Sequence, residues 1–267
     1  MKIKPKLISL SITIILMIIG GIIQFSTNNK TRMQNTVKLK EVSSYHEITI
    51  EDKIVLNIEE NYDTYLFYSK MFGISMDNLK KEIINANKES FNVYDLSNNG
   101  TCYETLDISL LHFLEDLEET KPKLFNRKYQ YKKVNKKYIY GLIDYFSSIY
   151  DNVDAKTLKA IAYLESGNLS ASSMMLKNNI FGGMASSGLI KYPSIEYGVY
   201  RYVLLMSKSY YGKGLTTVET IGKKYNPVTL GNRQIANPSW VAQVKNFISK
   251  FENNASLTLE TLKEIEG

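Results

Sequence analysis

The sequence predicts a mostly α protein: a compact helical domain that follows an apolar N-terminal segment and a helical accessory region. Three observations support this class. Apolar residues recur at helical spacing, cap residues precede these stretches, and Gly or Pro ends them. No alternating strand–helix pattern occurs, and neither GxGxxG nor GxxxxGKS is present, which sets nucleotide-binding folds aside.

Residues 7–25 carry no charge, and at ~1.5 Å rise each they nearly span a ~30 Å hydrocarbon core. Lys2, Lys4 and Lys6 precede this run, as expected for a cytoplasmic N-terminus. A cleaved signal peptide is the alternative, but its apolar part spans roughly 7–15 residues before an A-x-A-like site. The run here is longer and lacks that site. Residues 1–30 are therefore expected to be an uncleaved single-pass membrane anchor, with the remaining chain extracellular and away from nucleic acid.

Composition limits the partners further. The chain has 267 residues and a formal net charge of +6, which favours an anionic partner. Cys102 is the single cysteine, so no intramolecular disulfide is expected. With only His46 and His112 beside it, a Cys/His zinc site has too few ligands, and we expect no metal and no cofactor.

Residues 31–125 are expected to be a polar tether followed by helices of an accessory region whose role the sequence does not indicate. Ser75 begins one helical stripe that contains Leu79 and Ile83. Six Lys and Arg residues between positions 126 and 137 form either a solvated linker or a patch for an anionic polymer or lipid headgroups.

Residues 138–251 show five helical stretches, with a Gly- and Ser-rich excursion between the second and third. The second stretch ends at Gly167 and the fourth at Pro227. Helix starts are expected at Asp154, at Ser194, at a capping box of Thr216 with Glu219, and at Asn237 followed by Pro238.

Glu165 is the one carboxylate in an unusual place. It follows Leu158 and Ile161 at i+7 and i+4, on the buried stripe of its helix. Lost hydration disfavours the anion, so the pKa of the carboxyl should rise and the group should donate a proton near neutral pH. Ser166 and Gly167 end the helix and place the carboxyl beside an opening. A structural pairing with a lysine is the alternative.

The motifs AIAYLESGN, KNNIFGGM and KKYNP stand in this order in the chain. Together they resemble the glucosaminidase domain of cell-wall hydrolases, over residues 138–251. The resemblance implies a lysozyme-like helical catalytic domain at residues 126–252 with a very short β lobe, followed by a tail at 253–267. A membrane anchor ahead of such a domain looks like the membrane-bound glucosaminidases of Gram-positive bacteria. Nothing in that family accounts for residues 31–125.

The resemblance also implies roles for particular residues. Glu165 would be the general acid that protonates the glycosidic oxygen. Asn179, Phe181 and Gly182 would form the turn that lines the cleft, although a purely structural role for Asn179 is an equal alternative. Tyr225 matches a tyrosine near the scissile sugar, or is a core aromatic. Trp240 is either a stacking platform for a sugar ring or a core residue.

A second carboxylate is harder to find. Glycosidases usually place it ~5–5.5 Å from the acid for retention or ~6.5–9.5 Å for inversion. Residues 177–194 contain no Asp or Glu, and Glu196 is the nearest acid. Its position in the first turn of a helix is favourable for dipole reasons alone. Two mechanisms stay open: attack by the substrate's own 2-acetamido oxygen, or attack by a water that Glu196 or another acid positions.

These observations predict a membrane-anchored peptidoglycan hydrolase that cleaves the β-1,4 bond after N-acetylglucosamine, with glycan strands as its substrate. A membrane-protein partner is compatible with the anchor. The alternatives are a lytic transglycosylase or muramidase that cleaves after N-acetylmuramic acid, and a non-catalytic scaffold that binds peptidoglycan.

Overall fold

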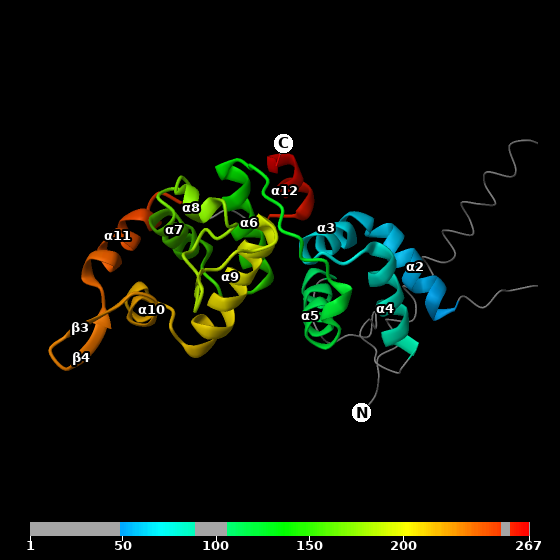
Figure 1. Ribbon diagram of the computed structural model, residues 1–267, viewed down its shortest axis with the longest axis horizontal. Helices are drawn as coiled ribbons and strands as arrows, with labels where there is room; N and C mark the ends of the chain where they lie inside the picture. The colour runs from blue at the N-terminus through cyan, green and yellow to red at the C-terminus, as the bar shows by residue number, and fades with distance from the viewer. Residues whose placement is uncertain (1–48, 89–105, 252–256, 267) are drawn as a thin grey trace, which may run out of the picture. The chain divides into compact units, whose positions relative to one another are not determined.

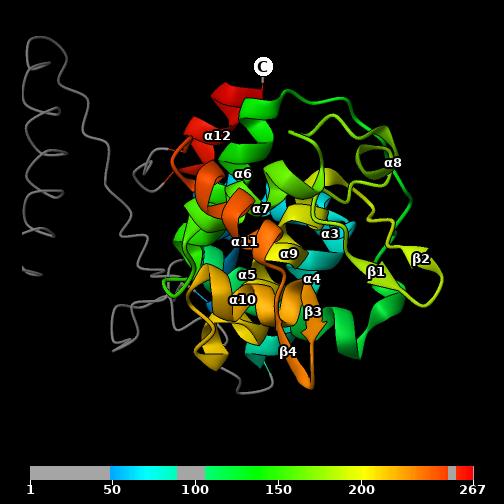
Figure 2. The same cartoon turned by 90° about the vertical axis from the view of Figure 1, so that its left-hand side faces the viewer.

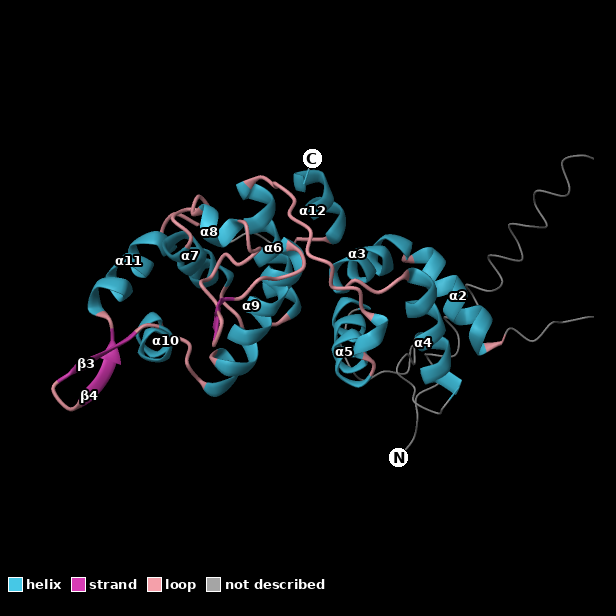
Figure 3. Ribbon diagram, viewed as in Figure 1, coloured by secondary structure: helices cyan, strands magenta, loops and turns pink. Residues whose placement is uncertain are grey.

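The computed structural model describes residues 49–88, 106–251 and 257–266. This part of the chain is mostly helical with few short strands, which confirms the mostly α character of the predicted fold class (Figures 1 and 3). The expected membrane anchor, residues 1–30, lies outside the described residues. Among the helices within them, none is both long enough and apolar enough to cross a bilayer.

The helices of the accessory region are α2 (Ile50–Glu60), α3 (Tyr62–Phe72), α4 (Met76–Lys88) and α5 (Leu106–Thr120), with a short 3₁₀ turn at Pro122–Leu124. The helices that follow are α6 (Lys136–Ile149), α7 (Ala155–Glu165), α8 (Ser172–Met175), α9 (Ile195–Ser209), α10 (Val218–Tyr225), α11 (Pro238–Ile248) and α12 (Leu259–Glu266), with a 3₁₀ turn at Tyr211–Lys213.

Helix caps agree with the sequence at three of the four expected starts. The side chains of Asp154, Ser194 and Asn237 each accept backbone N–H groups at the start of α7, α9 and α11. The start of α10 was predicted one residue early. Thr217 forms the capping box with Thr220, because each hydroxyl accepts the backbone N–H of the other residue.

The accessory helices share one core with the helices that follow. Phe72 of α3 packs edge-on against Tyr197 of α9, with ring centroids 5.6 Å apart. The hydroxyls of Tyr68 (α3) and Tyr145 (α6) form a hydrogen bond of 2.9 Å, and the Tyr145 hydroxyl also donates to the carboxylate of Asp107 (α5) at 2.5 Å. The described residues 49–88, 106–251 and 257–266 therefore belong to one compact unit, without the separation that the sequence placed between residues 125 and 126.

The expected C-terminal tail contains a packed helix. α12 lies beside α6 in Figure 1, and its Leu262 is fully buried there. The two helices approach closely at Gly141 on α6: a Cβ at that position would lie 3.2 Å from Cδ1 of Leu262, so the leucine side chain would have to shift by a few tenths of an ångström. Lys263 also forms an ion pair with Asp63 of α3, at 2.9 Å.

Two small antiparallel hairpins complete the fold. β1 (Met184–Ala185) and β2 (Gly188–Leu189) form the predicted short lobe. β3 (Pro227–Leu230) and β4 (Arg233–Ala236) form a second hairpin between α10 and α11 that the sequence analysis did not predict (Figure 3). Its two-residue loop contains Gly231, which has a φ of 59°.

Candidate active site

Glu165 faces a pocket of about 340 Å³ at the C-terminal end of α7. The turn after α8 supplies Phe181 and Gly182 to the pocket wall, α9 supplies Leu205, and α10 supplies Tyr225. Figure 2 views the molecule from the side on which α7, α9, α10 and α11 come together. The structure thus brings the glutamate, the Gly-rich turn and the tyrosine predicted from sequence to one pocket.

The end of α7 holds the Glu165 carboxyl at the pocket rather than in the core. Ser166 is fully buried, and its hydroxyl donates to the carbonyl of Ala162 at 2.5 Å and accepts from the Leu169 amide at 2.8 Å. Gly167 then leaves the helix with a φ of 57°. These contacts fix the last turn, so Glu165 projects from a rigid position.

Each oxygen of Glu165 has a defined neighbour. Oε1 accepts a hydrogen bond of 2.9 Å from the indole N–H of Trp240. Oε2 lies close to Gly182: a Cβ atom added to this glycine would be 3.6 Å from Oε2. Burial raises the pKa of the Glu165 carboxyl, and the bond from Trp240 opposes that rise because it stabilises the ionised form. A carboxyl with a raised pKa beside a pocket is suited to give up a proton to a bound ligand.

Trp240 lies behind the carboxyl and is only 4% exposed. Its ring stacks on Tyr225, with centroids 5.5 Å apart, and rests against Gly222 of α10. It does not line the Glu165 pocket. Of the two roles expected for Trp240, this burial favours the core residue over an open stacking platform, and the hydrogen bond of its indole N–H also orients Glu165.

Two tyrosines frame the carboxyl. The Tyr225 hydroxyl donates to the carbonyl of Phe181 at 2.5 Å. Tyr202 of α9 lines the pocket with its ring stacked on that of Phe181. Burial raises the pKa of both hydroxyls well above the usual range, and the nearby Glu165 charge adds to the effect. Both side chains are therefore neutral phenols at physiological pH.

Asn179 holds the turn together. Its side-chain amide donates to the carbonyls of Gly183 and Ile190 at 2.8 and 2.9 Å and accepts from the Gly183 amide at 3.0 Å. The residue is buried, and all three bonds are to backbone. This geometry favours the structural role for Asn179 over a hydrogen bond to a sugar.

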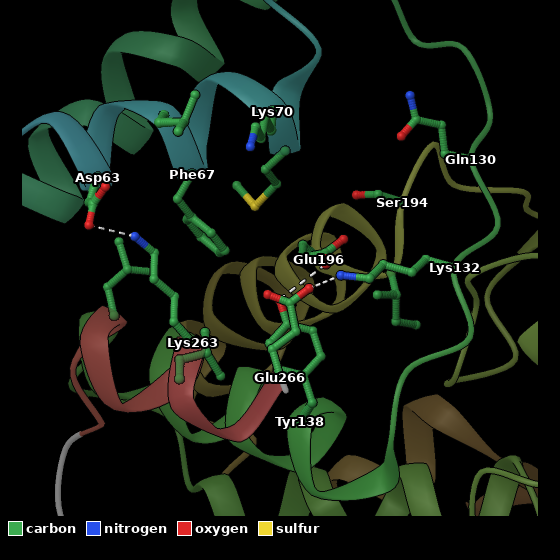
Figure 4. A pocket seen from close by; sticks show the side chains of 15 residues that line it. Asp63, Phe67, Lys70, Gln130, Lys132, Tyr138, Ser194, Glu196, Lys263 and Glu266 are labelled. Carbon is green, nitrogen blue, oxygen red and sulfur yellow. Dashed lines mark hydrogen bonds and ion pairs between the residues drawn. The ribbon is translucent and has the colours of Figure 1, made fainter.

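Glu196 lies in a different pocket. That pocket, of about 300 Å³, is lined by residues of α3, α12 and the start of α9 (Figure 4). There Glu196 accepts a hydrogen bond of 3.1 Å from the Tyr138 hydroxyl. It does not line the Glu165 pocket, so the structure does not place it as the second acid. Within the described part of the chain, Glu165 is the one acidic residue of its pocket wall.

Sequence reasoning missed several pocket residues. Tyr192, Tyr202 and Leu205 line the pocket but belong to no recognised motif. Tyr202 was expected on an inward helix face, which is correct, but the sequence does not say that this face borders a cavity. In the described ranges, no group of three or more His, Cys, Asp or Glu side chains is arranged to hold a metal ion.

Comparisons with protein-family models, with curated proteins and with solved structures gave no match to this chain.

Proposed function

We propose that this chain is a peptidoglycan hydrolase that cleaves the β-1,4 bond after N-acetylglucosamine, with Glu165 as the general acid. The observation that carries the proposal is the Glu165 carboxyl itself. It is half-buried, its pKa is raised, and it faces a pocket of about 340 Å³ at a fixed helix end. The motif resemblance around residues 165, 179–182 and 225 points to the same chemistry.

In the first step, Glu165 donates its proton to the glycosidic oxygen as the C1–O bond breaks. A nucleophile must then reach C1 from the opposite face. Since the described wall of the pocket offers no second carboxylate, we propose that the 2-acetamido carbonyl oxygen of the substrate forms the new bond to C1. The product of this step is a cyclic oxazolinium ion on the N-acetylglucosamine unit.

Tyr225 has a defined part in this step. Its proton is engaged with the Phe181 carbonyl, which leaves the phenolic oxygen as a hydrogen-bond acceptor. An acetamido N–H that donates to this oxygen would turn the acetamido carbonyl toward C1. In the second step, water attacks C1, the ring of the oxazolinium opens, and ionised Glu165 takes the proton from the water. The anomeric configuration is retained.

The N-terminal residues support a location for this activity. The uncharged run at residues 7–25 and the lysines before it favour a single-pass anchor with the catalytic region on the outer side of the membrane. We therefore propose that the substrate is the glycan near the membrane surface.

The test is a comparison of two Glu-to-Gln variants on purified cell walls. Glu165→Gln keeps the side-chain shape but removes the transferable proton, so wall cleavage should fall by at least about 100-fold. Glu196→Gln is the matched control, because it makes the same change in the other pocket, and it should retain cleavage. Mass spectrometry of the products should find reducing-end N-acetylglucosamine.

Other results would reject the proposal. Products with 1,6-anhydro-muramic ends would identify a lytic transglycosylase, and reducing-end muramic acid would identify a muramidase. Unchanged cleavage by Glu165→Gln would remove the assigned acid, and absence of cleavage by the unsubstituted chain would favour a binding scaffold.

A further inference from the structure

A second groove lies next to the Glu165 pocket. It has a volume of about 700 Å³ and is formed by the start of the linker before α6, the segment after β2, and α9. Tyr192 lines both the groove and the Glu165 pocket. On α9, Arg201 lines the groove and Leu205, one turn further along the same face, lines the Glu165 pocket. The two cavities are therefore neighbours along α9.

The groove is basic. Its wall contains three cationic side chains, Arg127, Lys191 and Arg201, and one carboxylate, Glu118. Arg127 forms a close ion pair with Glu118, whereas Arg201 is 3.9 Å from the other oxygen of that carboxylate. Lys191 is exposed and its ammonium lies 3.4 Å from the centroid of the Tyr129 ring. Three cationic side chains and one carboxylate give the groove wall a net charge of +2, which attracts an anion.

The segment that carries Lys191 is held rigidly. The amides of Ile190 and Tyr192 donate to the carbonyls of Gly183 and Lys177, both at 3.0 Å. The buried side chain of Asn178 donates to the Tyr192 carbonyl, also at 3.0 Å. Because this backbone is fixed, ligand binding has to order only the Lys191 side chain and not the segment that carries it.

We propose that this groove binds a carboxylate of the peptide carried by the muramic acid next to the cleaved bond. The inference rests on the proposed function, because peptidoglycan bears such a peptide on every second sugar of the strand. A glycan seated at Glu165 has a muramic acid beside the reacting N-acetylglucosamine. Its peptide would enter the neighbouring groove, where Arg201 and Lys191 pair with the carboxylate.

Binding measured in the Glu165→Gln background tests this inference without cleavage. The ligands are soluble glycan strands with their peptides intact, and the same strands after an amidase has hydrolysed the amide that joins each peptide to muramic acid. The amidase leaves a lactyl carboxylate on the sugar, so the stripped strands still carry an acid there and lack only the carboxylates of the peptide. The Glu165→Gln chain should bind the intact strands roughly fivefold more tightly. Adding Lys191→Gln and Arg201→Gln should bring the ratio to about one. Adding Lys53→Gln and Lys81→Gln, which removes equal charge from exposed positions on α2 and α4, should leave the ratio unchanged.

Each contrary result has a defined meaning. Equal binding of both strands, or a preference that survives Lys191→Gln and Arg201→Gln, overturns the inference. A preference that disappears when wall phosphate polymers are stripped with hydrofluoric acid also overturns it, since the anion would then be a phosphate. Cleavage by the unsubstituted chain tests the proposed function separately. If that chain does not cleave the wall but binds peptide-bearing strands more tightly, the proposed activity is rejected and the inference about the groove stands.

Discussion

The indole N–H of Trp240 donates a hydrogen bond of 2.9 Å to Oε1 of Glu165, across 75 positions of sequence. The bond joins α11 to the end of α7, and these two helices pack closely against each other. It influences the carboxyl in two ways. It fixes the orientation of the side chain, and it stabilises the ionised form against the opposing effect of burial.

Trp240→Phe should shift the pH dependence of cleavage. A general acid must be protonated, so its pKa sets the alkaline side of the kcat/KM profile. Removing the indole donor destabilises ionised Glu165 and raises its pKa further, which should move the alkaline limb to higher pH. Loss of orientation should lower kcat roughly ten- to a hundredfold. An active variant whose alkaline limb stays in place or moves to lower pH would contradict this assignment.

Glu165→Gln should stabilise the fold at neutral pH. The pKa of Glu165 is raised in the folded state, so the native chain holds this proton more tightly than the unfolded chain does. The resulting stability is present below the unfolded pKa, about 4.3, and is lost as the pH rises through the folded value. A glutamine side chain at this position does not ionise, so the variant does not lose this stability as the pH rises.

Thermal unfolding of both proteins at pH 4 and pH 7 measures the effect. The Tm of Glu165→Gln should exceed that of the unsubstituted chain at pH 7, and the difference should shrink at pH 4. A difference that grows on acidification would mean that the carboxyl is stabilised as the anion, and the general-acid role would fail.

Asn179→Ala should destabilise the turn beside Glu165. The variant loses three partly buried hydrogen bonds and leaves the carbonyls of Gly183 and Ile190 without these donors. We expect a loss of roughly 2–4 kcal/mol in the free energy of unfolding. Asn246→Ala, at an exposed position on α11, is the control and should change stability by less than about 0.5 kcal/mol. Similar values for the two variants would contradict the holding role of Asn179.

Lys159→Met should lower the free energy of unfolding, because it breaks a buried ion pair. Lys159 and Asp144 are 3% and 5% exposed, and Nζ lies 2.7 and 3.0 Å from the two carboxylate oxygens. Removing one buried partner costs about 3–5 kcal/mol. The same change at Lys208, whose pair with Glu115 is at the surface, should cost about 1 kcal/mol or less. Urea unfolding of both variants measures the difference.

Local sequence signals predicted much of the helical framework. Three caps are as expected, because side-chain capping acts within a few residues. The short β1–β2 lobe agrees with the one that the motif resemblance implies. The β3–β4 hairpin was missed although a local signal exists: Gly231 and Asn232 form a two-residue loop of the kind that favours tight hairpins. The packed helix at the C-terminus was also missed, since its burial depends on contact with α6, which is far away in the sequence.

The site was predictable only in part. The spacing around Glu165 indicates a partly buried carboxyl, because periodicity within one helix determines which side faces the core. The hydrogen bond from Trp240, the position of Glu196 in another pocket and the basic groove beside Tyr192 depend on how distant helices meet. The spacing of apolar residues within one segment does not show which distant helix that segment packs against.

The contact between Gly222 and Trp240 has a consequence for the evolution of this site. A Cβ at position 222 would lie 2.9 Å from the indole ring and 3.0 Å from Cβ of Ala236, so even alanine there would force the ring or its neighbours to shift. Positions 222 and 240 should consequently covary. Homologues with tryptophan at position 240 should also have glycine at position 222. Homologues with a larger residue at position 222 should have a different hydrogen-bond donor to the carboxyl of Glu165.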